Sequence, residues 1–264
     1  MNHKKQKNRI KRLFFRFYEI RSGVSFVACT AMILVCSVLI SGFSERSTQD
    51  ILTENALNVN SFTGSDSLNI IIDPGHGGAD GGATGANGVL EKDLNLDLSL
   101  KLRDMLLFHG YRAVMTREDD SMHFSEGSPL SKKVQDTKYR VDLTKGYENC
   151  IFVSIHMNKF VSPKYSGLQV YYSQNDPESI EIAKRIQTLT RELLQCENDR
   201  KVKKADSTIY VLDKATVPAV LVECGFLSNE EETALLCSNE YRKLLASVIF
   251  EALDGYISEK STDK

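Results

Sequence analysis

Tryptophan is absent from the 264-residue sequence, and proline, histidine and cysteine are scarce, at five, five and six residues. So little proline excludes collagen-like and proline-rich disordered chains, and so few cysteines exclude a disulfide-knotted scaffold. Hydrophobic residues make up 42% of the chain and charged residues 26%, which is typical of a globular protein. We therefore expect a buried core, with roughly 200 residues available for one domain once the N-terminal segment is set aside.

Long hydrophobic runs are also absent, with one exception near the N-terminus. Residues 24–42 carry no charge, and their length just reaches the roughly 17–20 residues that span a bilayer. Eight basic residues and one acidic residue precede the run, so the positive-inside rule predicts a cytoplasmic tail at residues 1–23. The run is longer than the apolar region of a usual signal peptide. This favours an uncleaved transmembrane anchor over cleavage near Ser41 or Gly42.

The chain after the anchor is expected to lie on the far side of the membrane. Residues 43–67 are polar and predict a stalk, which leaves residues 68–264 as the folded domain. Without the charged residues of the basic tail, the chain has a net charge of -9. Nucleic-acid binding depends mainly on basic residues that neutralise phosphates, so we expect no nucleic-acid partner.

Four cysteines follow the predicted anchor, and none of them forms a CxxC pair. Cys150 and Cys224 adjoin apolar runs, where a free thiol behaves as a small buried hydrophobe. We expect free thiols, with one disulfide among Cys150, Cys196, Cys224 and Cys237 as the alternative.

Apolar runs typical of buried strands alternate with helical patterns after residue 67. Strands are predicted at 68–72, 111–116, 150–155, 167–172, 208–212 and 218–222, and helices at 91–109, 134–147, 177–194 and 241–257. This alternation predicts a single α/β domain, in which helices flank a twisted, mostly parallel sheet. The predicted transmembrane helix precedes it.

Two histidines have no ordinary structural explanation. His3 lies in the basic tail, His109 adjoins a predicted helix end, and His123 lies in a polar loop. His76 and His156 instead follow predicted buried strands directly. In α/β sheets, the groups that bind ligands gather beyond the carboxyl ends of the strands.

Glu91 is the carboxylate that best complements these two histidines. It opens a predicted helix after a glycine-rich loop that begins at His76, so this loop can return it toward His76. Two histidines and one carboxylate are a common zinc set that leaves a fourth position open for water. The alternative is an acidic residue that stabilises the N-terminus of a helix.

Glu223 ends the last predicted strand and is expected to be poorly exposed. Burial raises the pKa of a carboxyl group, which suits a general base near neutral pH. The alternative is a buried ion pair, with Arg117 as its partner. Asn158 is interpreted either as a turn residue or as a residue that forms a hydrogen bond with substrate.

Four motifs, in family order, resemble the zinc-dependent N-acetylmuramoyl-L-alanine amidases of the Amidase_3 type. They are DPGHGG at 73–78, LEKD at 90–93, SIHMN at 154–158 and PAVLVECGFLSN at 218–229. The resemblance covers about residues 68–257 and makes residues 68–264 a catalytic domain. It implies one Zn²⁺ per chain on His76, Glu91 and His156, with Glu223 as the catalytic carboxylate. It also implies that the enzyme cuts the amide between N-acetylmuramic acid and L-alanine in peptidoglycan.

Within that family, a membrane segment joined to a catalytic domain without wall-binding repeats is similar to amidases that mature the spore cortex. This implies formation of muramic-δ-lactam, a location in the intermembrane space of the developing spore, and peptidoglycan strands with stem peptides as the partner. Alternatives are a vegetative amidase of daughter-cell separation, and a different zinc amidohydrolase or peptidase. A non-catalytic wall-binding adaptor is the weakest alternative, because none of the four expected groups is missing. The need for a protein activator stays open.

Overall fold

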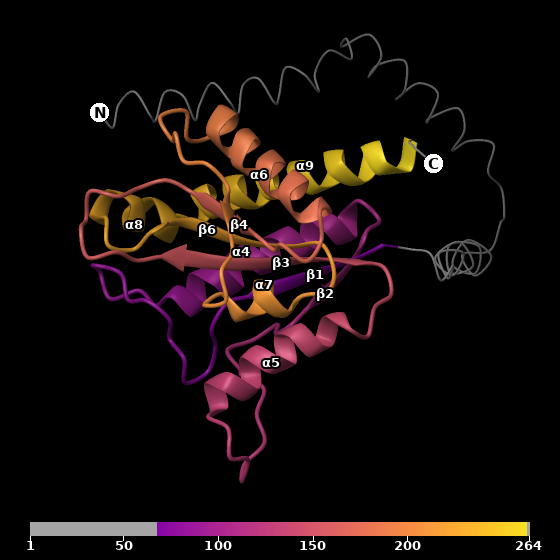
Figure 1. Ribbon diagram of the computed structural model, residues 1–264. Helices are drawn as coiled ribbons and strands as arrows, with labels where there is room; N and C mark the ends of the chain where they lie inside the picture. Colours follow the sequence, from indigo (N-terminus) through magenta and orange to yellow (C-terminus); the bar gives the residue numbers. More distant parts are fainter. Residues whose placement is uncertain (1–67, 263–264) are drawn as a thin grey trace, which may run out of the picture. The chain divides into compact units, whose positions relative to one another are not determined.

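The computed structural model describes residues 68–262, and Figure 1 shows a sheet with helices on both faces. Six strands follow the order β2-β1-β3-β6-β4-β5. Their bounds are β1 Asn69–Pro74, β2 Arg112–Met115, β3 Cys150–Asn158, β4 Gln169–Tyr172, β5 Lys203–Lys204 and β6 Ala219–Phe226. β3 and β6 form the centre, and nearly all their residues are buried. Their apolar runs follow from this position, because both faces of a central strand are covered.

The sheet is mostly parallel, as predicted. β1 pairs in parallel with β2 and β3, β3 with β6, and β4 with β5, whereas β4 runs antiparallel to β6. The predicted α/β class is therefore confirmed, with one antiparallel pairing that makes the sheet mixed.

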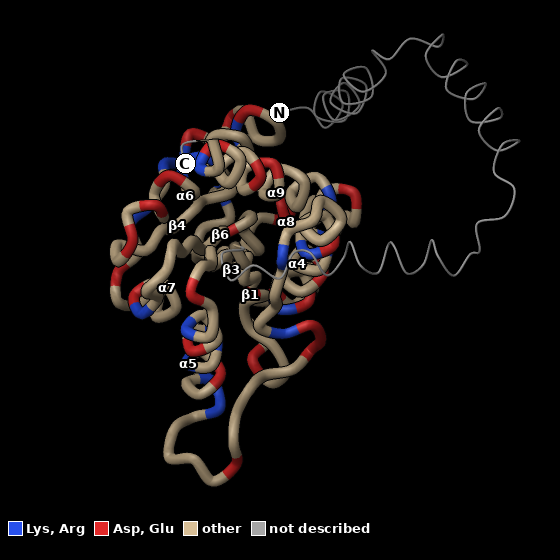
Figure 2. Tube along the Cα trace, turned by 90° about the vertical axis from the view of Figure 1, so that its right-hand side faces the viewer, with Lys and Arg blue, Asp and Glu red and all other residues tan. Residues whose placement is uncertain are grey.

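Helices cover the two faces unequally. α4 Glu91–Phe108, α6 Glu178–Leu193, α8 Glu230–Cys237 and α9 Asn239–Thr262 contribute to the larger core cluster. α5 Lys132–Thr144 and α7 Tyr210–Lys214 contribute to the smaller cluster, and α5 lies across the sheet from α6 and α9 in Figure 1. Alternate residues of one strand supply the two clusters: Phe152 belongs to the smaller and Val153 to the larger. Figure 2 shows basic and acidic residues interspersed along the helices.

One predicted strand is wrong. Residues 208–212 form the end of a turn and the first residues of helix α7. Asp206 causes the turn, because its carboxylate accepts a hydrogen bond from the backbone N–H of Thr208 at 2.9 Å, as in an Asx turn. The β-branched residues of this segment favoured a strand, but local turn chemistry prevails.

Helix α8 was not predicted, and two strands are longer than expected. Asn229 caps α8 by accepting a hydrogen bond from the backbone N–H of Glu232. β3 continues to Asn158 and β6 to Phe226, so His156 and Glu223 lie within strands and do not follow them. Polar residues at these strand ends resemble the start of a loop in the sequence, but the pairing of β3 with β6 continues through them.

The described residues belong to the compact unit Leu68–Lys264. None of the helices within residues 68–262 is long and apolar enough to cross a membrane. The predicted tail, anchor and stalk at residues 1–67 lie outside the described residues and stay predictions.

Candidate metal centre and active site

His76 follows β1 in a left-handed backbone conformation. Its φ of 61° is the only positive value for a non-glycine residue among residues 68–262. Its Nδ1 lies 2.9 Å from Oδ2 of Asp80, and its Nε2 lies 3.2 Å from Oε2 of Glu91. Burial alone would lower the pKa of His76, but the hydrogen bonds and charges of Glu91 and Asp80 outweigh it and raise this pKa.

Glu91 is the first residue of α4 and is 4% exposed. The glycine-rich loop returns it to His76, as the sequence predicted. Its Oε2 accepts a hydrogen bond from the N–H of Ala83 at 2.8 Å, and its Oε1 accepts one from the N–H of Met157 at 3.0 Å. Burial opposes its ionisation, but hydrogen bonds and charges from His156 and His76 outweigh it and lower the pKa of Glu91 well below its usual range.

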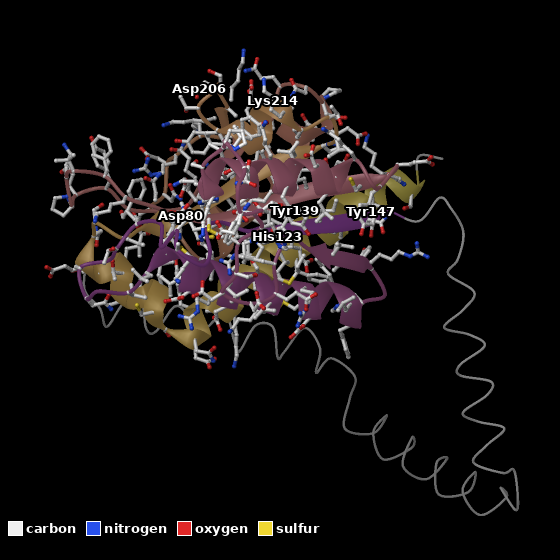
Figure 3. All side chains as sticks on the ribbon, turned by 90° about the horizontal axis from the view of Figure 1, so that it is seen from below. Asp80, His123, Tyr139, Tyr147, Asp206 and Lys214 are labelled. Carbon is white, nitrogen blue, oxygen red and sulfur yellow. The ribbon has the colours of Figure 1, made fainter. Side chains whose placement is uncertain are left out.

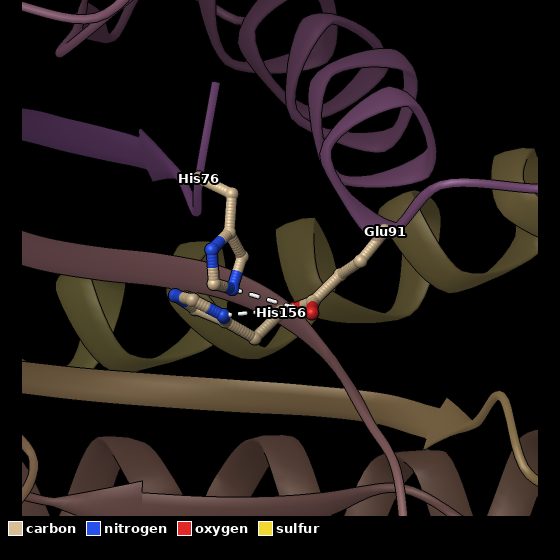
Figure 4. A group of neighbouring side chains, drawn as sticks. All are labelled: His76, Glu91 and His156. Atoms are coloured by element: carbon tan, nitrogen blue, oxygen red, sulfur yellow. Dashed lines mark hydrogen bonds and ion pairs between the residues drawn. The ribbon is translucent and has the colours of Figure 1, made fainter. Parts of the chain in front are cut away.

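His156 completes the group from β3. Its Nδ1 lies 2.9 Å from Oε1 of Glu91, and its ring meets that of His76 edge-on with centroids 4.9 Å apart. Figure 4 shows both rings turned toward the Glu91 carboxylate. Gly75 allows this placement, because a Cβ atom there would lie 2.2 Å from the His156 ring.

These three side chains form a candidate metal site. One ligand atom from each lies within 4.8 Å of the others, and no other such group occurs among the described residues. The donor set fits a zinc ion, because it supplies two imidazole nitrogens and a carboxylate oxygen and leaves one coordination position open. Asp80 would orient His76 from behind, as carboxylates commonly do for metal-bound histidines.

Glu223 lies directly opposite His156 in the β3–β6 register. Its Oε2 is buried and has no hydrogen-bond partner among the described residues. Burial, reinforced by the negative charge of Glu91, raises the pKa of Glu223 to about 7, although the two histidines act in the opposite direction. A buried carboxylate near neutrality can accept and return a proton.

The alternative partner for Glu223 is wrong. Arg117 donates its hydrogen bonds to backbone carbonyls: those of Pro74 at 3.0 Å, Gly75 at 3.0 Å, Asp119 at 2.8 Å and Lys92 at 2.9 Å. It therefore holds the loop that carries His76 and does not neutralise Glu223.

A buried ion pair beneath the site was not predicted. Arg140 of α5 donates to Oδ1 of Asp73 at 2.6 Å and to the carbonyl oxygens of Pro74 and His76 at 2.7 Å each. Ser154 also donates to Asp73, at 2.6 Å. Burial would raise the pKa of Asp73, but the charge of Arg140 and the hydrogen bonds outweigh it and lower this pKa. The signal available in the sequence was a carboxylate that directly follows an apolar strand.

Asn158 ends β3 opposite Phe226. Its carbonyl oxygen accepts a hydrogen bond from the N–H of Leu227 at 2.7 Å, and its side chain is half-buried. The structure thus places Asn158 in a strand and not in a turn. Its predicted contact with substrate stays a prediction.

The other described histidines have structural roles. His109 ends α4, with its Nδ1 2.8 Å from the carbonyl oxygen of Met105. His123 stacks on Tyr139 with ring centroids 3.7 Å apart, and Figure 3 shows the two side by side. The four cysteines of the described part are free, and both Cys150 and Cys224 are buried, as expected.

A His–Glu–His group beside a buried carboxylate, near the carboxyl ends of β1, β3 and β6, defines a candidate site of a metal-dependent hydrolase. Comparison with known families agrees with this class. The N-acetylmuramoyl-L-alanine amidase family, Amidase_3, matches residues 70–255, and the chain belongs to it. The resemblance inferred from the four motifs is confirmed.

Relatives and solved structures of this family are similar over most of the domain. The germination-specific N-acetylmuramoyl-L-alanine amidase of Bacillus subtilis is 39% identical, over 72% of this chain and 80% of the relative. The CwlD amidase of Clostridioides difficile, solved in complex with the GerS lipoprotein, is 38% identical with a TM-score of 0.69, over 72% of this chain and 98% of that one. The amidase AmiC2 of Nostoc punctiforme is 33% identical with a TM-score of 0.63, over 74% and 99%.

Proposed function

We propose that this protein is a zinc-dependent peptidoglycan hydrolase that cleaves the amide between the lactyl group of N-acetylmuramic acid and L-alanine of the stem peptide. The observation that carries the proposal is the meeting of His76, Glu91 and His156 within 4.8 Å in a chain of the amidase family. Each of the three comes from a separate element, so the fold builds this site from distant parts of the sequence.

In this proposal His76, Glu91 and His156 hold one zinc ion. Zinc bound there would lower the pKa of a water molecule and polarise the amide carbonyl. Glu91 already lies within hydrogen-bond distance of both imidazoles, at 3.2 and 2.9 Å. The ligands therefore need little reorganisation when the metal binds.

Glu223 is proposed to move the proton. As a carboxylate it accepts a proton from the attacking water, and as an acid it returns the proton to the leaving nitrogen of L-alanine. A pKa of about 7 suits both steps, because the two forms are then similarly populated near neutral pH. Asn158 is proposed to contact the substrate from the end of β3.

Product analysis tests this activity. The full-length protein, loaded with zinc, would be incubated with peptidoglycan and the products measured by mass spectrometry. Free stem peptides that begin with L-alanine, together with peptide-free muramic acid, support the proposal. Cleavage within the peptide would identify a peptidase, and release of acetate would identify a deacetylase.

A role in the spore cortex is the finer part of the proposal. It is supported by the similarity to a germination-specific amidase and to the CwlD amidase. Deletion of the gene should remove muramic-δ-lactam from spore peptidoglycan. Unseparated daughter cells with normal cortex would instead favour the vegetative alternative.

Membrane anchoring through residues 24–42 places the catalytic domain outside the cytoplasm. Protease added to right-side-out protoplasts should then remove the domain, and complete protection would contradict this topology.

A protein activator is also proposed, because the similar CwlD amidase was solved in complex with a lipoprotein. Co-purification of the anchored chain from its own membrane would test for one.

A further inference from the structure

A cluster of unpaired cations lies at one edge of the sheet. Four of the five residues from Arg200 to Lys204 are basic, although the chain beyond its basic tail is acidic overall. No carboxylate oxygen of the described residues lies within 4.0 Å of the charged groups of Arg200, Lys201, Lys203 or Lys204. Cations without a salt-bridge partner at one edge of an acidic protein attract anionic ligands, although the charge of Arg200 also favours the ionised form of Glu232.

Gln169 connects this cluster to Glu223. Gln169 and Glu223 are cross-strand partners in the antiparallel β4–β6 pair, so their side chains lie on the same face of the sheet. Oε1 of Gln169 lies 3.5 Å from Nη1 of Arg200, and Nε2 of Gln169 donates to the carbonyl oxygen of Lys201 at 2.6 Å. A single side chain therefore separates the Arg200 guanidinium from the proposed acid–base residue.

Aromatic rings hold the guanidinium in place. Cζ of Arg200 lies 4.6 Å above the ring of Phe226 and 5.8 Å from that of Tyr165. Its Nε donates to the carbonyl oxygen of Ser166 at 2.9 Å. Nη2 has no acceptor among the described residues. The Arg200 guanidinium therefore has N–H donors available for a carboxylate. Stacking also favours arginine over lysine here.

The order of these groups across the sheet defines which part of the substrate meets Arg200. The three proposed metal ligands lie on the side of β1 and β3, Glu223 lies on β6, and Gln169 and Arg200 follow on the β4 side. The scissile carbonyl belongs near the metal and the leaving nitrogen near Glu223. A leaving peptide that continues in this direction across the sheet reaches the side of Arg200.

We propose that Arg200, stacked on Phe226 and Tyr165, forms a subsite that binds a free carboxylate of the stem peptide close to the scissile amide. This inference rests on the proposed amidase function and deepens it, because it makes a carboxylate on the leaving peptide a determinant of specificity. The neighbouring lysines add to the attraction without the planar fork that pairs with a carboxylate.

Two muramoyl dipeptides test this subsite. Both carry L-alanine on the lactyl group, and the second residue bears either a free α-carboxylate or the uncharged carboxamide. The full-length zinc enzyme should prefer the carboxylate by about tenfold or more in kcat/KM, as expected for one charge-assisted hydrogen-bonded pair. Arg200→Ala should bring this preference close to one, and Arg200→Lys should restore only part of it. Arg191→Ala, an exposed position on α6 across the sheet, should leave the preference as it is.

The preference is a ratio measured on one preparation, so partial misfolding of a variant cancels. Arg200→Gln provides a second variant that keeps a polar side chain. An unchanged preference in both Arg200→Ala and Arg200→Gln would overturn the subsite. An equal loss on both dipeptides would also overturn it and would indicate a general structural or wall-attracting role. A wild-type enzyme that cleaves neither dipeptide nor intact peptidoglycan would instead overturn the proposed function.

Discussion

Glu223 on β6 and His156 on β3 are register partners, so their side chains lie on the same face of the sheet, and the Oε2 atom of Glu223 has no hydrogen-bond partner among the described residues. An unpartnered buried carboxyl oxygen is costly, since such a group usually forms hydrogen bonds. Here it lies beside the proposed metal ligands. The cost is explained if this oxygen forms a hydrogen bond with substrate or with a water molecule during the reaction.

Replacement of Glu223 by Gln should remove nearly all turnover while keeping the fold and most of the zinc. Gln is nearly isosteric with Glu, and Arg117 is not left unpaired, because it binds backbone carbonyls. The amide cannot accept a proton, so kcat should fall by about 10²–10⁴. Turnover, zinc content and thermal melting of the purified variant measure these effects.

Glu232→Gln is a matched control for that experiment. Glu232 is also buried, and burial raises its pKa, but its carboxylate accepts hydrogen bonds from the N–H groups of Phe226 and Gly167 at 2.7 Å each. This variant should lower the melting temperature and keep the activity of the folded fraction. The assignment of Glu223 fails if its own variant behaves in that way.

Activity should depend on the charge of Glu223. A general base works only when it is deprotonated, and burial raises the pKa of Glu223 to about 7. kcat/KM should therefore fall as the pH decreases below the pKa of Glu223. A bound cation stabilises the carboxylate, so the acid limb of the zinc enzyme should lie at or below pH 7. The residual activity of Glu223→Gln should not show this decrease of kcat/KM at acid pH. If the decrease is unchanged in the variant, another group is responsible for it.

Gly75→Ala should weaken zinc binding through His156. A Cβ atom at residue 75 would lie 2.2 Å from the His156 ring, so the ring must move out of the proposed ligand position. Gly81→Ala is the control in the same loop, because its Cβ would meet only Leu90 at 3.5 Å, an ordinary contact. Zinc affinity measured by chelator competition should drop for the first variant only. Equal affinities would contradict the assignment of His156 as a ligand.

The sequence predicted the meeting of His76, Glu91 and His156 because simple rules govern each position. Groups at the carboxyl ends of parallel strands converge at one edge of a sheet, which brings β1 and β3 together. The glycine-rich loop then returns Glu91 to the same place. Local pattern and sheet topology are sufficient for this part of the site.

These rules do not predict which buried charges pair with each other. Asp73 pairs with Arg140, 67 residues away, and Arg117 binds carbonyl oxygens instead of Glu223. Which cation reaches which anion depends on how α5 packs against the sheet, and hydrophobic periodicity does not encode that packing. The wrong strand at residues 208–212 has a local cause, the turn made by Asp206, which strand propensity does not register.

The Asp73–Arg140 pair leads to a prediction for stability. Asp73 is 1% exposed and Arg140 is 5% exposed, and Arg140 also donates to Asp136, which is 4% exposed. Removal of Arg140 therefore leaves two carboxylates buried without their cation. Arg140→Met should lower the free energy of unfolding at neutral pH by about 3–5 kcal/mol, as for other broken buried pairs. Lys145→Met, which removes an exposed ion pair with Asp142 at the end of the same helix, should change the melting temperature little.

The pH dependence of this loss identifies its source. Arg140 helps to hold the pKa of Asp73 below its usual value in the folded state, so the pair contributes fully above the unfolded pKa of about 3.9. That contribution is lost as the pH falls through the folded pKa, because Asp73 then takes up a proton. In Arg140→Met, burial without the cation favours protonation of Asp73 at higher pH. The difference in unfolding free energy between wild type and variant should therefore be largest near neutral pH. It should narrow as the pH falls, first through the higher pKa of Asp73 in the folded variant and then through its lower pKa in the folded wild type. Urea titrations at several pH values measure it, and a difference independent of pH would mean that lost packing, and not the unpaired charge, destabilises the variant.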